Sequence, residues 1–451
     1  MNLDDTIVAI ATPPGRGGIS VVRLSGADAR SIAAGMLRLS YELQAGRALF
    51  GELIEPGTGD RIDEVVVTFF AKPHSYTTDD VIEISAHGSP VVLRHVIALA
   101  TAAGARLAEP GEFTMRGFLN GRIDLTQAEA VRDLIDSQTM YQARVAAQQL
   151  QGALSRRLQP IKKKLVELIA VMEAGIDFAE DDVSVLPGDE IRQRLNGIQL
   201  PLEQLRASFA YGKIVHEGFT LAIVGRPNVG KSSLFNRMVE RERAIVTATP
   251  GTTRDLVTET VALGGIPVKL IDTAGIRQAR DEAESIGIRK SYEALTEADL
   301  VLVVIESTQP LSREDHDLLD ACQNRRAIAV INKADLDVAR THAIDNFKIF
   351  RTSALTGEGI EQLREEILRA ITGQGVGEHE SGFLTNVRHQ RLVEEALTSL
   401  EAARHAVGRN IPHEMIMLDL YGALRPLDAI TGETTTDDIL NLIFSSFCIG
   451  K

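Results

Sequence analysis

Several residue classes are scarce in this sequence of 451 residues. It has no tryptophan, only two cysteines (Cys322 and Cys448) and 4% aromatic residues. Two cysteines cannot build a disulfide framework, which fits a reducing compartment. With so few aromatic rings, extensive stacking against nucleic-acid bases is not expected. No apolar run reaches the ~18 residues that a membrane span requires, and the first residues are acidic, unlike a signal peptide. We therefore expect a cytoplasmic protein that does not bind membranes.

The net charge of −14 further limits the possible partners. A strongly acidic chain repels the phosphate backbone, so broad electrostatic binding to nucleic acid is not expected. Any RNA contact would use a local basic patch. One candidate is the run of Arg156 and Arg157 with residues 162–164, which are all lysine. The alternative is that this run is simply the solvated face of a helix.

The chain length is enough for roughly three domains. Residues 1–118 alternate β-rich runs with turns and helical patterns, so we predict an α+β domain there. Its expected strands lie at 7–11, 18–24, 64–70 and 81–85, and a helix is expected from about Ser89.

The remaining sequence predicts a discontinuous helical domain with another domain inserted into it. Helical periodicity marks residues 119–215 and returns within 375–451, at 392–406 and 418–427. Between them, residues 216–374 follow a βαβ pattern with unbroken apolar strands, as in a parallel sheet. The alternative is three domains in a simple row.

The clearest motif is a phosphate-binding loop. The apolar run Leu221–Val224 leads into Gly225-Arg226-Pro227-Asn228-Val229-Gly230-Lys231-Ser232, placed between a buried strand and the start of a helix. Backbone N–H groups and the helix N-terminus would hold phosphates, Lys231 would neutralise their charge, and the Ser232 hydroxyl would bind Mg²⁺. We expect nucleotide contacts from Asn228 to Ser233.

A second motif identifies the base. Asp335 in Asn332-Lys333-Ala334-Asp335 can accept from both N1–H and the exocyclic amine of guanine, a donor pair that adenine lacks. Ser353, Ala354 and Leu355 fit a backbone contact behind the guanine ring. Together, the two motifs predict a Ras-like P-loop GTPase domain; the alternative is a chance glycine turn with a chance Asn-Lys pair.

Two further motifs fit the loops that contact the γ-phosphate. The first is Thr247-Ala248-Thr249-Pro250-Gly251-Thr252-Thr253, in which Thr253 is our candidate Mg²⁺ ligand. The second is Asp272-Thr273-Ala274-Gly275, in which Asp272 would point towards the metal and Gly275 towards the γ-phosphate. Ile276 follows, where Ras-like enzymes have a water-orienting glutamine nearby. Another group must orient the water, and residues 280–284 supply acidic candidates.

From end to end, the chain resembles the bacterial and organellar tRNA modification GTPase family called MnmE or TrmE. Besides the GTPase motifs, the resemblance rests on residues 5–9, 12–18, 111–114, 118–121 and the C-terminal Phe447-Cys448-Ile449-Gly450-Lys451. It implies that residues 1–118 dimerise and bind a tetrahydrofolate derivative, in the 5-formyl or 5,10-methylene form. By similarity, the folate contacts are Arg23, Glu83, Arg122 and Lys451. Without the resemblance, Arg23 and Glu83 would read as a surface ion pair.

This sequence departs from the family pattern at two places. The family usually has Lys at the position of Arg122, so charge is kept but the geometry changes. Residues 77–80 read Thr-Thr-Asp-Asp where a Gly-Glu pair is more common.

The resemblance also implies a reaction and its partners. The family works as a homodimer with a flavoprotein that carries the FAD, forming a heterotetramer. Together they install a carboxymethylaminomethyl or aminomethyl group on C5 of the wobble uridine of certain tRNAs. Family members are activated by K⁺, which implies Asn228, Thr247, Thr249 and Thr252 as ion ligands. Asn228 could instead only stabilise its loop.

The same resemblance assigns water activation to Glu284, acting with Lys231 and Asp272 in catalysis. Taken alone, Glu284 would be one acid among several on a solvated loop. Cys448 is either a nucleophile on the uridine ring or a buried structural thiol.

Two other classes of protein are alternatives. A GTP-dependent switch in ribosome assembly would share the nucleotide motifs but would be expected to carry a KH domain or a second GTPase domain. The sequence has neither pattern. A scaffold with a degenerate nucleotide site is disfavoured by the intact motifs.

Overall fold

The computed structural model describes residues 4–177, 186–239, 258–272, 296, 298–336, 344–373, 382–434, 440 and 443–450. Its contacts divide the chain into two compact units, one of residues 1–132 with 428–451 and the other of residues 133–427. By these contacts, residues 428–451 group with residues 1–132, and the predicted domain limits stay a prediction. In the described part of the chain, no helix is long and apolar enough to cross a membrane.

The first unit is built on a seven-stranded mixed sheet in the order β3-β4-β5-β6-β2-β1-β7. Its strands are β1 (Ile7–Ile10), β2 (Gly17–Ser25), β3 (Leu37–Leu39), β4 (Ala48–Ile54), β5 (Arg61–Phe70), β6 (Val81–Gly88) and β7 (Arg106–Leu107). Along β5, Val65 and Val67 are buried and Val66 is exposed, so only one face of this strand meets the core. The helices are α1 (Ala29–Met36), α2 (Pro90–Ala102) and α3 (Glu112–Leu119). Apolar residues of α1 and α2 complete the core.

The expected α+β domain is confirmed, and each of its four predicted strands is present. Strands β3, β4 and β7 were not predicted. Gly51 interrupts the apolar pattern of β4, and the fold needs it there because a Cβ would lie 2.3 Å from Leu39 Cδ2. A glycine that allows close strand packing therefore hid the strand from sequence analysis.

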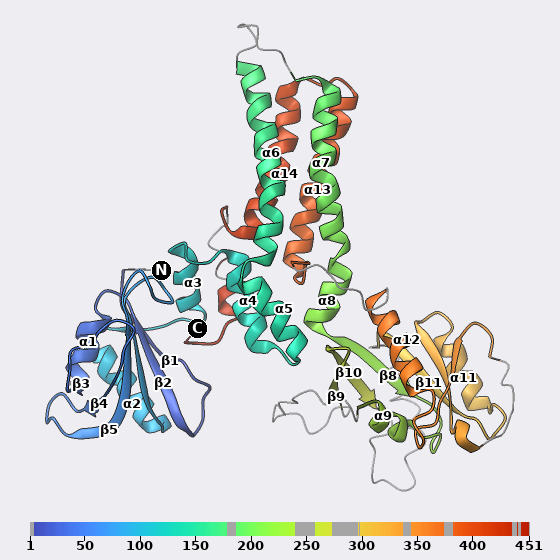
Figure 1. Cartoon of the computed structure of the whole chain (residues 1–451), viewed down its shortest axis with the longest axis horizontal. Helices are drawn as coiled ribbons and strands as arrows, with labels where there is room; N and C mark the ends of the chain where they lie inside the picture. Colours follow the sequence, from blue (N-terminus) through green and yellow to red (C-terminus); the bar gives the residue numbers. More distant parts are fainter. Residues whose placement is uncertain are drawn as a thin grey trace. The chain divides into compact units, whose positions relative to one another are not determined.

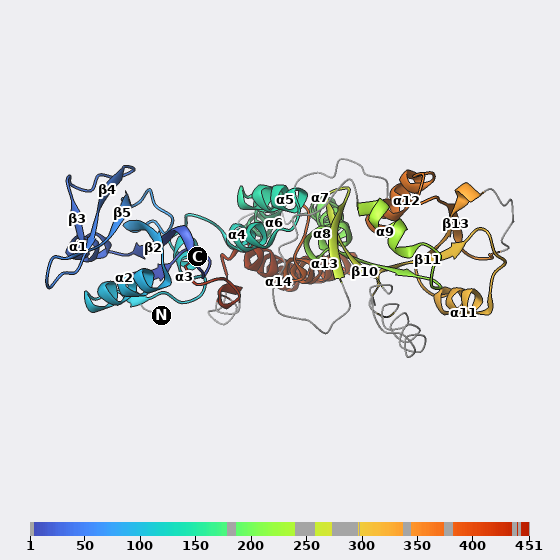
Figure 2. The same cartoon turned by 90° about the horizontal axis from the view of Figure 1, so that it is seen from below.

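Helices from both ends of the second unit pack together. The helical elements are α4 (Leu125–Asp136), α5 (Met140–Leu150), α6 (Ala153–Asp177), α7 (Gly188–Ala207), α8 (Phe209–Glu217), α13 (Val387–Gly408) and α14 (His413–Thr431). Figure 1 shows α6, α7, α13 and α14 side by side, and Figure 2 views this bundle end-on. Since α7 precedes and α13 follows the nucleotide-binding motifs, the discontinuous helical domain is confirmed.

The inserted domain has a six-stranded sheet in the order β13-β12-β11-β8-β10-β9, in which only the β9–β10 pair is antiparallel. The strands are β8 (Phe219–Val224), β9 (Thr258–Leu263), β10 (Ile266–Asp272), β11 (Leu300–Glu306), β12 (Ala327–Asn332) and β13 (Lys348–Arg351). The described helices are α9 (Lys231–Val239), α11 (Arg313–Cys322) and α12 (Ile360–Thr372), with a short 3₁₀ helix at Ala334–Leu336. Apolar clusters cover both faces of the sheet. The carboxyl ends of β8, β11 and β12 therefore bring their following loops to one edge.

Candidate functional sites

The phosphate-binding loop joins β8 to α9, where the sequence placed it. Two glycines give this loop its path: Gly225 has φ 151° and Gly230 has φ 95°. A Cβ on Gly225 would lie 2.3 Å from the Val304 carbonyl oxygen, and one on Gly230 would lie 2.3 Å from Asn332 Nδ2. Asn228 also adopts positive φ, at 65°. The loop thus depends on residues that tolerate left-handed backbone and close contacts.

Lys231 brings its positive charge into this loop. Its side chain is buried, and Nζ donates to the carbonyl oxygens of Gly225 at 2.7 Å and Arg226 at 2.8 Å. Ser232 and Ser233 are exposed in the first turn of α9. An ammonium group and a helix N-terminus therefore meet in one loop, an arrangement suited to a phosphate chain.

Asn332 connects the phosphate loop to the guanine motif. The residue is buried, and its Nδ2 donates to the Val229 carbonyl at 2.9 Å. Its Oδ1 accepts from the backbone N–H of Ala354 at 3.1 Å. Motifs about a hundred residues apart are therefore held by one side chain, which fixes the distance between the phosphate and base sites.

Asp335 lies beside the third motif. Ser353 Oγ donates to Asp335 Oδ1 at 2.6 Å, which orients the carboxylate. The Leu355 side chain is 80% exposed, so a ligand can contact it. The structure thus brings Asn332, Asp335 and residues 353–355 together at the end of β12.

Lys333 has φ 64° and is held by Glu306 and Ser307, two contacts that were not predicted. Lys333 Nζ lies 2.9 Å from Glu306 Oε1, and this hydrogen bond, followed by one from Thr308, lowers the pKa of Glu306. Ser307 Oγ donates to the Lys333 carbonyl at 2.7 Å. In the sequence, only one feature pointed to Glu306 as a site residue: it is the polar residue that ends the apolar run of β11.

The loops predicted to contact the γ-phosphate fall largely beyond the described residues. Asp272 is the final residue of β10 and pairs in register with Ile223 of β8, so its backbone reaches the edge that carries the phosphate loop. Residues 247–253 (including Thr247, Thr249, Thr252 and Thr253), residues 273–275 and Glu284 lie outside the described residues. Their roles stay predictions.

A second candidate site is a pocket of about 550 Å³ in the first unit. It contains three of the four predicted folate contacts, Arg23, Glu83 and Arg122, whereas Lys451 lies outside the described residues. The other lining residues are Phe70, Pro73, His74, Ser75, Tyr76 and Val81. Antiparallel pairing of β2 with β6 places Arg23 opposite Glu83, so residues 60 positions apart become neighbours.

Arg23 is held from several directions. Its Nε donates to Glu83 Oε1 at 2.9 Å, and its Nη1 donates to the Gly450 carbonyl at 3.3 Å. Its Cζ also lies 5.4 Å from the centre of the Tyr76 ring and 5.5 Å from that of Phe113. A guanidinium fixed by a carboxylate, a carbonyl and two rings is prepared to receive an anionic or planar group.

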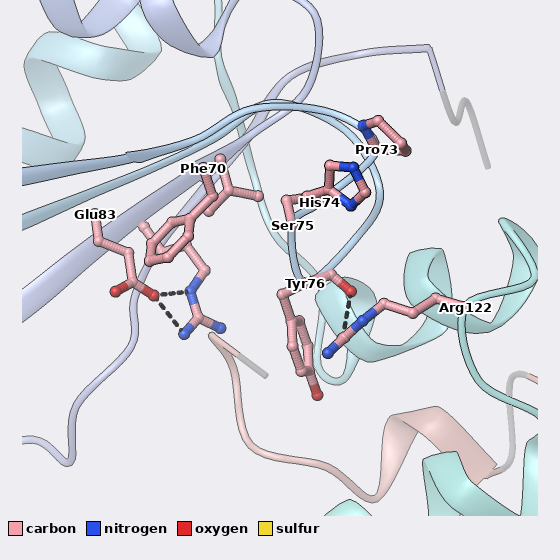
Figure 3. Close-up of a pocket in the computed structure, with 9 residues that line it drawn as sticks. Phe70, Pro73, His74, Ser75, Tyr76, Glu83 and Arg122 are labelled. Carbon is pink, nitrogen blue, oxygen red and sulfur yellow. Dashed lines mark hydrogen bonds and ion pairs between the residues drawn. The ribbon is translucent and has the colours of Figure 1, made fainter. Parts of the chain in front are cut away.

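Tyr76 also contacts the second cation of the pocket. Figure 3 shows the Arg122 side chain beside the Tyr76 ring, with its guanidinium hydrogen-bonded to the Tyr76 carbonyl oxygen. That bond measures 2.8 Å, and Arg122 Cζ lies 4.9 Å from the ring centre. Three further lining residues, Phe70, His74 and Tyr76, were not predicted. Phe70 ends β5, and the other two lie between β5 and β6, where no local motif marks a binding site.

The departure at residues 77–80 lies between Tyr76 and Val81, two residues that line this pocket. Thr77 is buried, with its Oγ1 2.7 Å from Ser25 Oγ and its carbonyl accepting from Asn120 Nδ2 at 2.7 Å. Thr78 has φ 68°, which is unfavourable for a β-branched residue. A glycine in the usual family pattern would relieve such strain, whereas this chain holds the turn with side-chain hydrogen bonds.

The C-terminal tail docks beside the pocket. Ile449 forms an isolated antiparallel β-bridge with Pro110, and the Gly111 N–H donates to the Cys448 carbonyl at 3.4 Å. The Cys448 side chain is exposed, which contradicts the alternative of a buried structural thiol and leaves the nucleophile as a prediction. Gly450 has φ 94°, and a Cβ there would lie 2.4 Å from the Ile10 carbonyl oxygen. The tail therefore needs glycine to lie this close to β1.

A partly buried ion network joins Asp5, just before β1, to Arg106 of β7 and to two buried residues of α3. Arg106 Nε donates to Asp5 Oδ2 at 2.6 Å and Arg106 Nη2 to Glu112 Oε1 at 2.6 Å. Arg116 Nη2 bonds to Asp5 Oδ1 at 2.5 Å and to Glu112 Oε1 at 2.9 Å. The hydrogen bond from Arg106 lowers the pKa of Asp5. Burial raises the pKa of Glu112, but the bonds from Arg106, Glu109 N–H and Arg116 outweigh it, so the net pKa is lowered.

Two family models match this chain. The family model described as the MnmE helical domain matches residues 125–448, and that described as the GTP-binding protein TrmE N-terminus matches residues 6–122. A solved structure of Aquifex aeolicus Era bound to GDP·AlF₄⁻ has 26% identity over 40% of this chain and 67% of that chain, with a TM-score of 0.28.

Three curated relatives are each named tRNA modification GTPase MnmE. The protein from Koribacter versatilis is 67% identical over 100% of both chains. The protein from Aquifex aeolicus is 43% identical over 99% of this chain and 100% of its own. The protein from Acetivibrio thermocellus is 40% identical over 100% of both chains. This chain therefore belongs to the MnmE family of tRNA modification GTPases.

Proposed function

We propose that this chain hydrolyses GTP at the phosphate loop and that the resulting cycle supports modification of C5 of the wobble uridine in certain tRNAs. The observation that best supports this is the Asn332 side chain, which joins the phosphate loop to the guanine motif. The names of the relatives support the tRNA part of the proposal.

Each residue of the nucleotide site has a stated role in this proposal. The backbone N–H groups of Asn228–Ser233 and the charge of Lys231 bind the phosphates, while Ser232 and Thr253 bind Mg²⁺. Asp335 accepts from guanine, and residues 353–355 lie behind its ring. The remaining nucleotide contacts are Thr247–Thr253, Asp272–Gly275, Asn332 and Lys333. The described part fits GTP because Lys231 lies within the loop and the Asp335 carboxylate is already oriented by Ser353.

Hydrolysis also needs a group that orients water and a cation near the phosphates. We assign water activation to Glu284, with Lys231 and Asp272 assisting, and K⁺ binding to Asn228, Thr247, Thr249 and Thr252. A bound K⁺ would neutralise charge that develops during phosphoryl transfer, as an arginine finger does elsewhere.

We further assign the N-terminal pocket to a tetrahydrofolate derivative that donates a one-carbon unit. The lining fits such a molecule: Arg23 and Arg122 offer cations for its carboxylates, Tyr76 offers a flat ring, and Glu83 can accept from N–H groups of a pterin. Lys451, one residue beyond Gly450, would add another cation. Gly450 contacts Arg23 directly, which supports this placement of the tail.

The assembly follows from the same family. We propose a cytoplasmic homodimer that contacts tRNA and associates with an FAD-binding partner protein in a heterotetramer. Residues 1–118 would form the folate and dimerisation domain, 119–215 and 375–451 the helical domain, and 216–374 the GTPase domain.

One kinetic experiment tests the proposed hydrolysis. GTP turnover should be faster in K⁺ than in Na⁺ at equal ionic strength, and Glu284→Ala should lower turnover by roughly 10²–10⁴-fold with GTP affinity intact. Glu282→Ala is the matched control, since it removes a nearby acid and should keep most of the activity. Equal rates in both salts would contradict the K⁺ assignment, and unchanged turnover in Glu284→Ala would remove that residue from the mechanism.

A further inference from the structure

Arg226 lies at the start of the phosphate loop, directly after Gly225, and is not among the predicted nucleotide contacts. Its side chain binds α11: Nε donates to Asp315 Oδ1 at 3.0 Å and lies 2.9 Å from Asp315 Oδ2. The Arg226 side chain is 19% exposed and that of Asp315 only 1%. An ion pair that is largely removed from water therefore ties the phosphate loop to a helix 89 positions along the chain.

The Asp315 carboxylate is held in place by its own helix. Asp315 is in the first turn of α11, where its Oδ2 accepts from the Ser312 backbone N–H and from Ser312 Oγ, each at 2.9 Å. The Asp315 N–H donates back to Ser312 Oγ at 3.2 Å, which completes a capping box. The N-terminal end of a helix also favours a negative charge. The carboxylate is thus a fixed point to which Arg226 is attached.

The backbone of Arg226 passes this constraint to Lys231. Lys231 Nζ donates to the Arg226 carbonyl oxygen at 2.8 Å and to that of Gly225 at 2.7 Å. Because these bonds hold a buried ammonium group, its position depends on where the two carbonyls lie. Two consecutive contacts, from Asp315 to Arg226 and from Arg226 to Lys231, therefore connect α11 with the group that neutralises phosphate charge.

The alternative is that Arg226 contacts phosphates directly, as an arginine finger does. Its Nε is bonded to Asp315, and most of its side chain is buried. Its charge also acts on Glu306. The hydrogen bonds from Lys333 and Thr308 lower the pKa of Glu306 most, and the charge of Arg226 lowers it further. A guanidinium that interacts with two carboxylates of its own domain is better suited to organising the loop than to reaching a phosphate.

We propose that Asp315 is a positioning residue for GTP binding and hydrolysis, which acts through Arg226 to fix the course of the phosphate loop and the place of Lys231. This role rests on the GTP hydrolysis proposed above and adds α11 to that site. Because the ion pair acts on the phosphate side, recognition of guanine by Asp335 should not depend on it.

Calorimetric titration of the full-length chain with GTP, GDP and inosine triphosphate tests this role. Asp315→Asn keeps the size of the side chain but removes its charge, so the Kd for GTP and that for GDP should each rise roughly 10-fold. The ratio of the Kd for inosine triphosphate, which lacks the exocyclic amine, to that for GTP should stay within about 2-fold of the native ratio. A variant that merely folds less well would bind fewer nucleotides per chain at an unchanged Kd. Native GTP affinity in Asp315→Asn would overturn the proposal.

Two controls separate the ion pair from the stability of α11. Ser312→Ala removes the hydroxyl of the capping box but keeps Arg226 and Asp315, so it should lower the melting temperature by about 2–4 °C and leave the Kd for GTP unchanged. Asp317→Asn, which removes an exposed acid of the same helix, should change neither quantity. If Ser312→Ala binds GTP as weakly as Asp315→Asn, the cap rather than the ion pair supports the loop, and the proposal is wrong.

A double-mutant cycle shows whether Asp315 acts through Arg226. Arg226→Gln should weaken GTP binding about as much as Asp315→Asn, and the double variant should bind no more weakly than either, because both changes break the same contact. Arg226 is partly exposed, so its variant provides the test even if Asp315→Asn does not fold. Losses that simply add in the double variant would contradict the proposal.

Steady-state kinetics of the same samples separate this role from the proposed function. In Asp315→Asn and Arg226→Gln, kcat/KM for GTP should fall roughly 10-fold or more. Native turnover in both variants would overturn the role of Asp315 alone, whereas a native chain that does not hydrolyse GTP would remove the proposed function and this role with it.

Hydrogen exchange at saturating GDP observes the loop directly. In Asp315→Asn, the amides of residues 225–233 should exchange faster than in the native chain, while those of the guanine motif at 332–335 should exchange as before. Equal exchange of residues 225–233 in the two proteins would show that Asp315 does not hold the loop.

Discussion

The nucleotide site and the N-terminal pocket are built in different ways. The phosphate loop is one run of consecutive residues between β8 and α9, and the guanine motif joins it through a single side chain, Asn332. The pocket takes its residues from β2, the end of β5, β6, the loop before β6 and the segment after α3. The C-terminal tail lies alongside. A local site can be recognised from a short motif, whereas a dispersed site exists only once the chain has folded.

This difference predicts that damage to one site should leave the other intact. The largest effect is expected from Asp335→Asn, which replaces a charge-assisted bond to guanine. Since such a bond contributes about 1.5–3 kcal/mol, the Kd for GTP should rise roughly 10–100-fold, and xanthosine triphosphate should bind better than it does to the native chain. Calorimetric titration with each nucleotide measures both changes.

The control for this variant is Asp317→Asn, which removes an exposed acid of α11 in the same domain. It should bind GTP as the native chain does, and both variants should bind 5-formyltetrahydrofolate normally. Unchanged GTP affinity in Asp335→Asn would show that another group recognises the guanine base.

A smaller effect is expected at the dispersed site from Gly450→Ala. The new Cβ would lie 2.4 Å from the Ile10 carbonyl in a backbone conformation with φ 94°, so the tail must shift and Arg23 must lose its bond to Gly450. A strain on the order of 1–3 kcal/mol predicts roughly 10-fold weaker binding of 5-formyltetrahydrofolate, measured by calorimetry, with unchanged GTP turnover.

Gly57→Ala is the control for the tail variant, because a Cβ there meets nothing within 4 Å. If Gly450→Ala binds the folate as tightly as Gly57→Ala does, the docked tail plays no part in the pocket. A loss of GTP turnover in Gly450→Ala would show that the two sites are not independent.

The smallest predicted effect concerns acid stability of the unit that carries the pocket. The folded pKa values of Asp5 and Glu112 are lowered below their ordinary values of 3.8 and 4.5, so both carboxylates stabilise the fold above those values. That stabilisation is lost as the pH falls from about 4.5 through the lowered pKa values that the two carboxyl groups have in the folded chain. Hydrogen exchange of the whole chain should show β1 and α3 opening first below this pH.

The variant Arg106→Gln tests whether the ion network causes this sensitivity to acid. Removing the guanidinium should lower the melting temperature at pH 7 by on the order of 2–4 °C and make the unit less sensitive to acid. Arg94→Gln, on the exposed side of α2, should behave like the native chain. An unchanged pH profile in Arg106→Gln would mean that the network does not set the acid limit.

The two sites also differ in how far the sequence alone predicted them. Gly225, Lys231 and Asp335 were recognised because their roles depend on spacing along the chain, and the structure brings their motifs together. Arg23, Glu83 and Arg122 came only from the family resemblance, since no local pattern links residues on separate strands. Tyr76 was missed, because its place in the pocket depends on the hydrogen bonds that hold Thr77.

The tail shows a second limit of sequence reasoning. Its residues were predicted as part of the helical domain, and this assignment did not foresee that residues 428–451 group by contacts with residues 1–132. Contacts across more than four hundred positions, such as Arg23 with Gly450, leave no periodicity in the sequence. The exposure of Cys448 likewise follows from where the tail docks and could not be foreseen.

The measurement that most directly tests the whole account is mass spectrometry of tRNA nucleosides from cells that lack this chain. The account predicts that wobble uridines lose their C5 aminomethyl-type group and regain it when the native chain is restored, whereas Glu284→Ala fails to restore it. Wobble uridines that are fully modified without the chain would contradict this, and would instead favour a GTP-dependent switch in another process such as ribosome assembly.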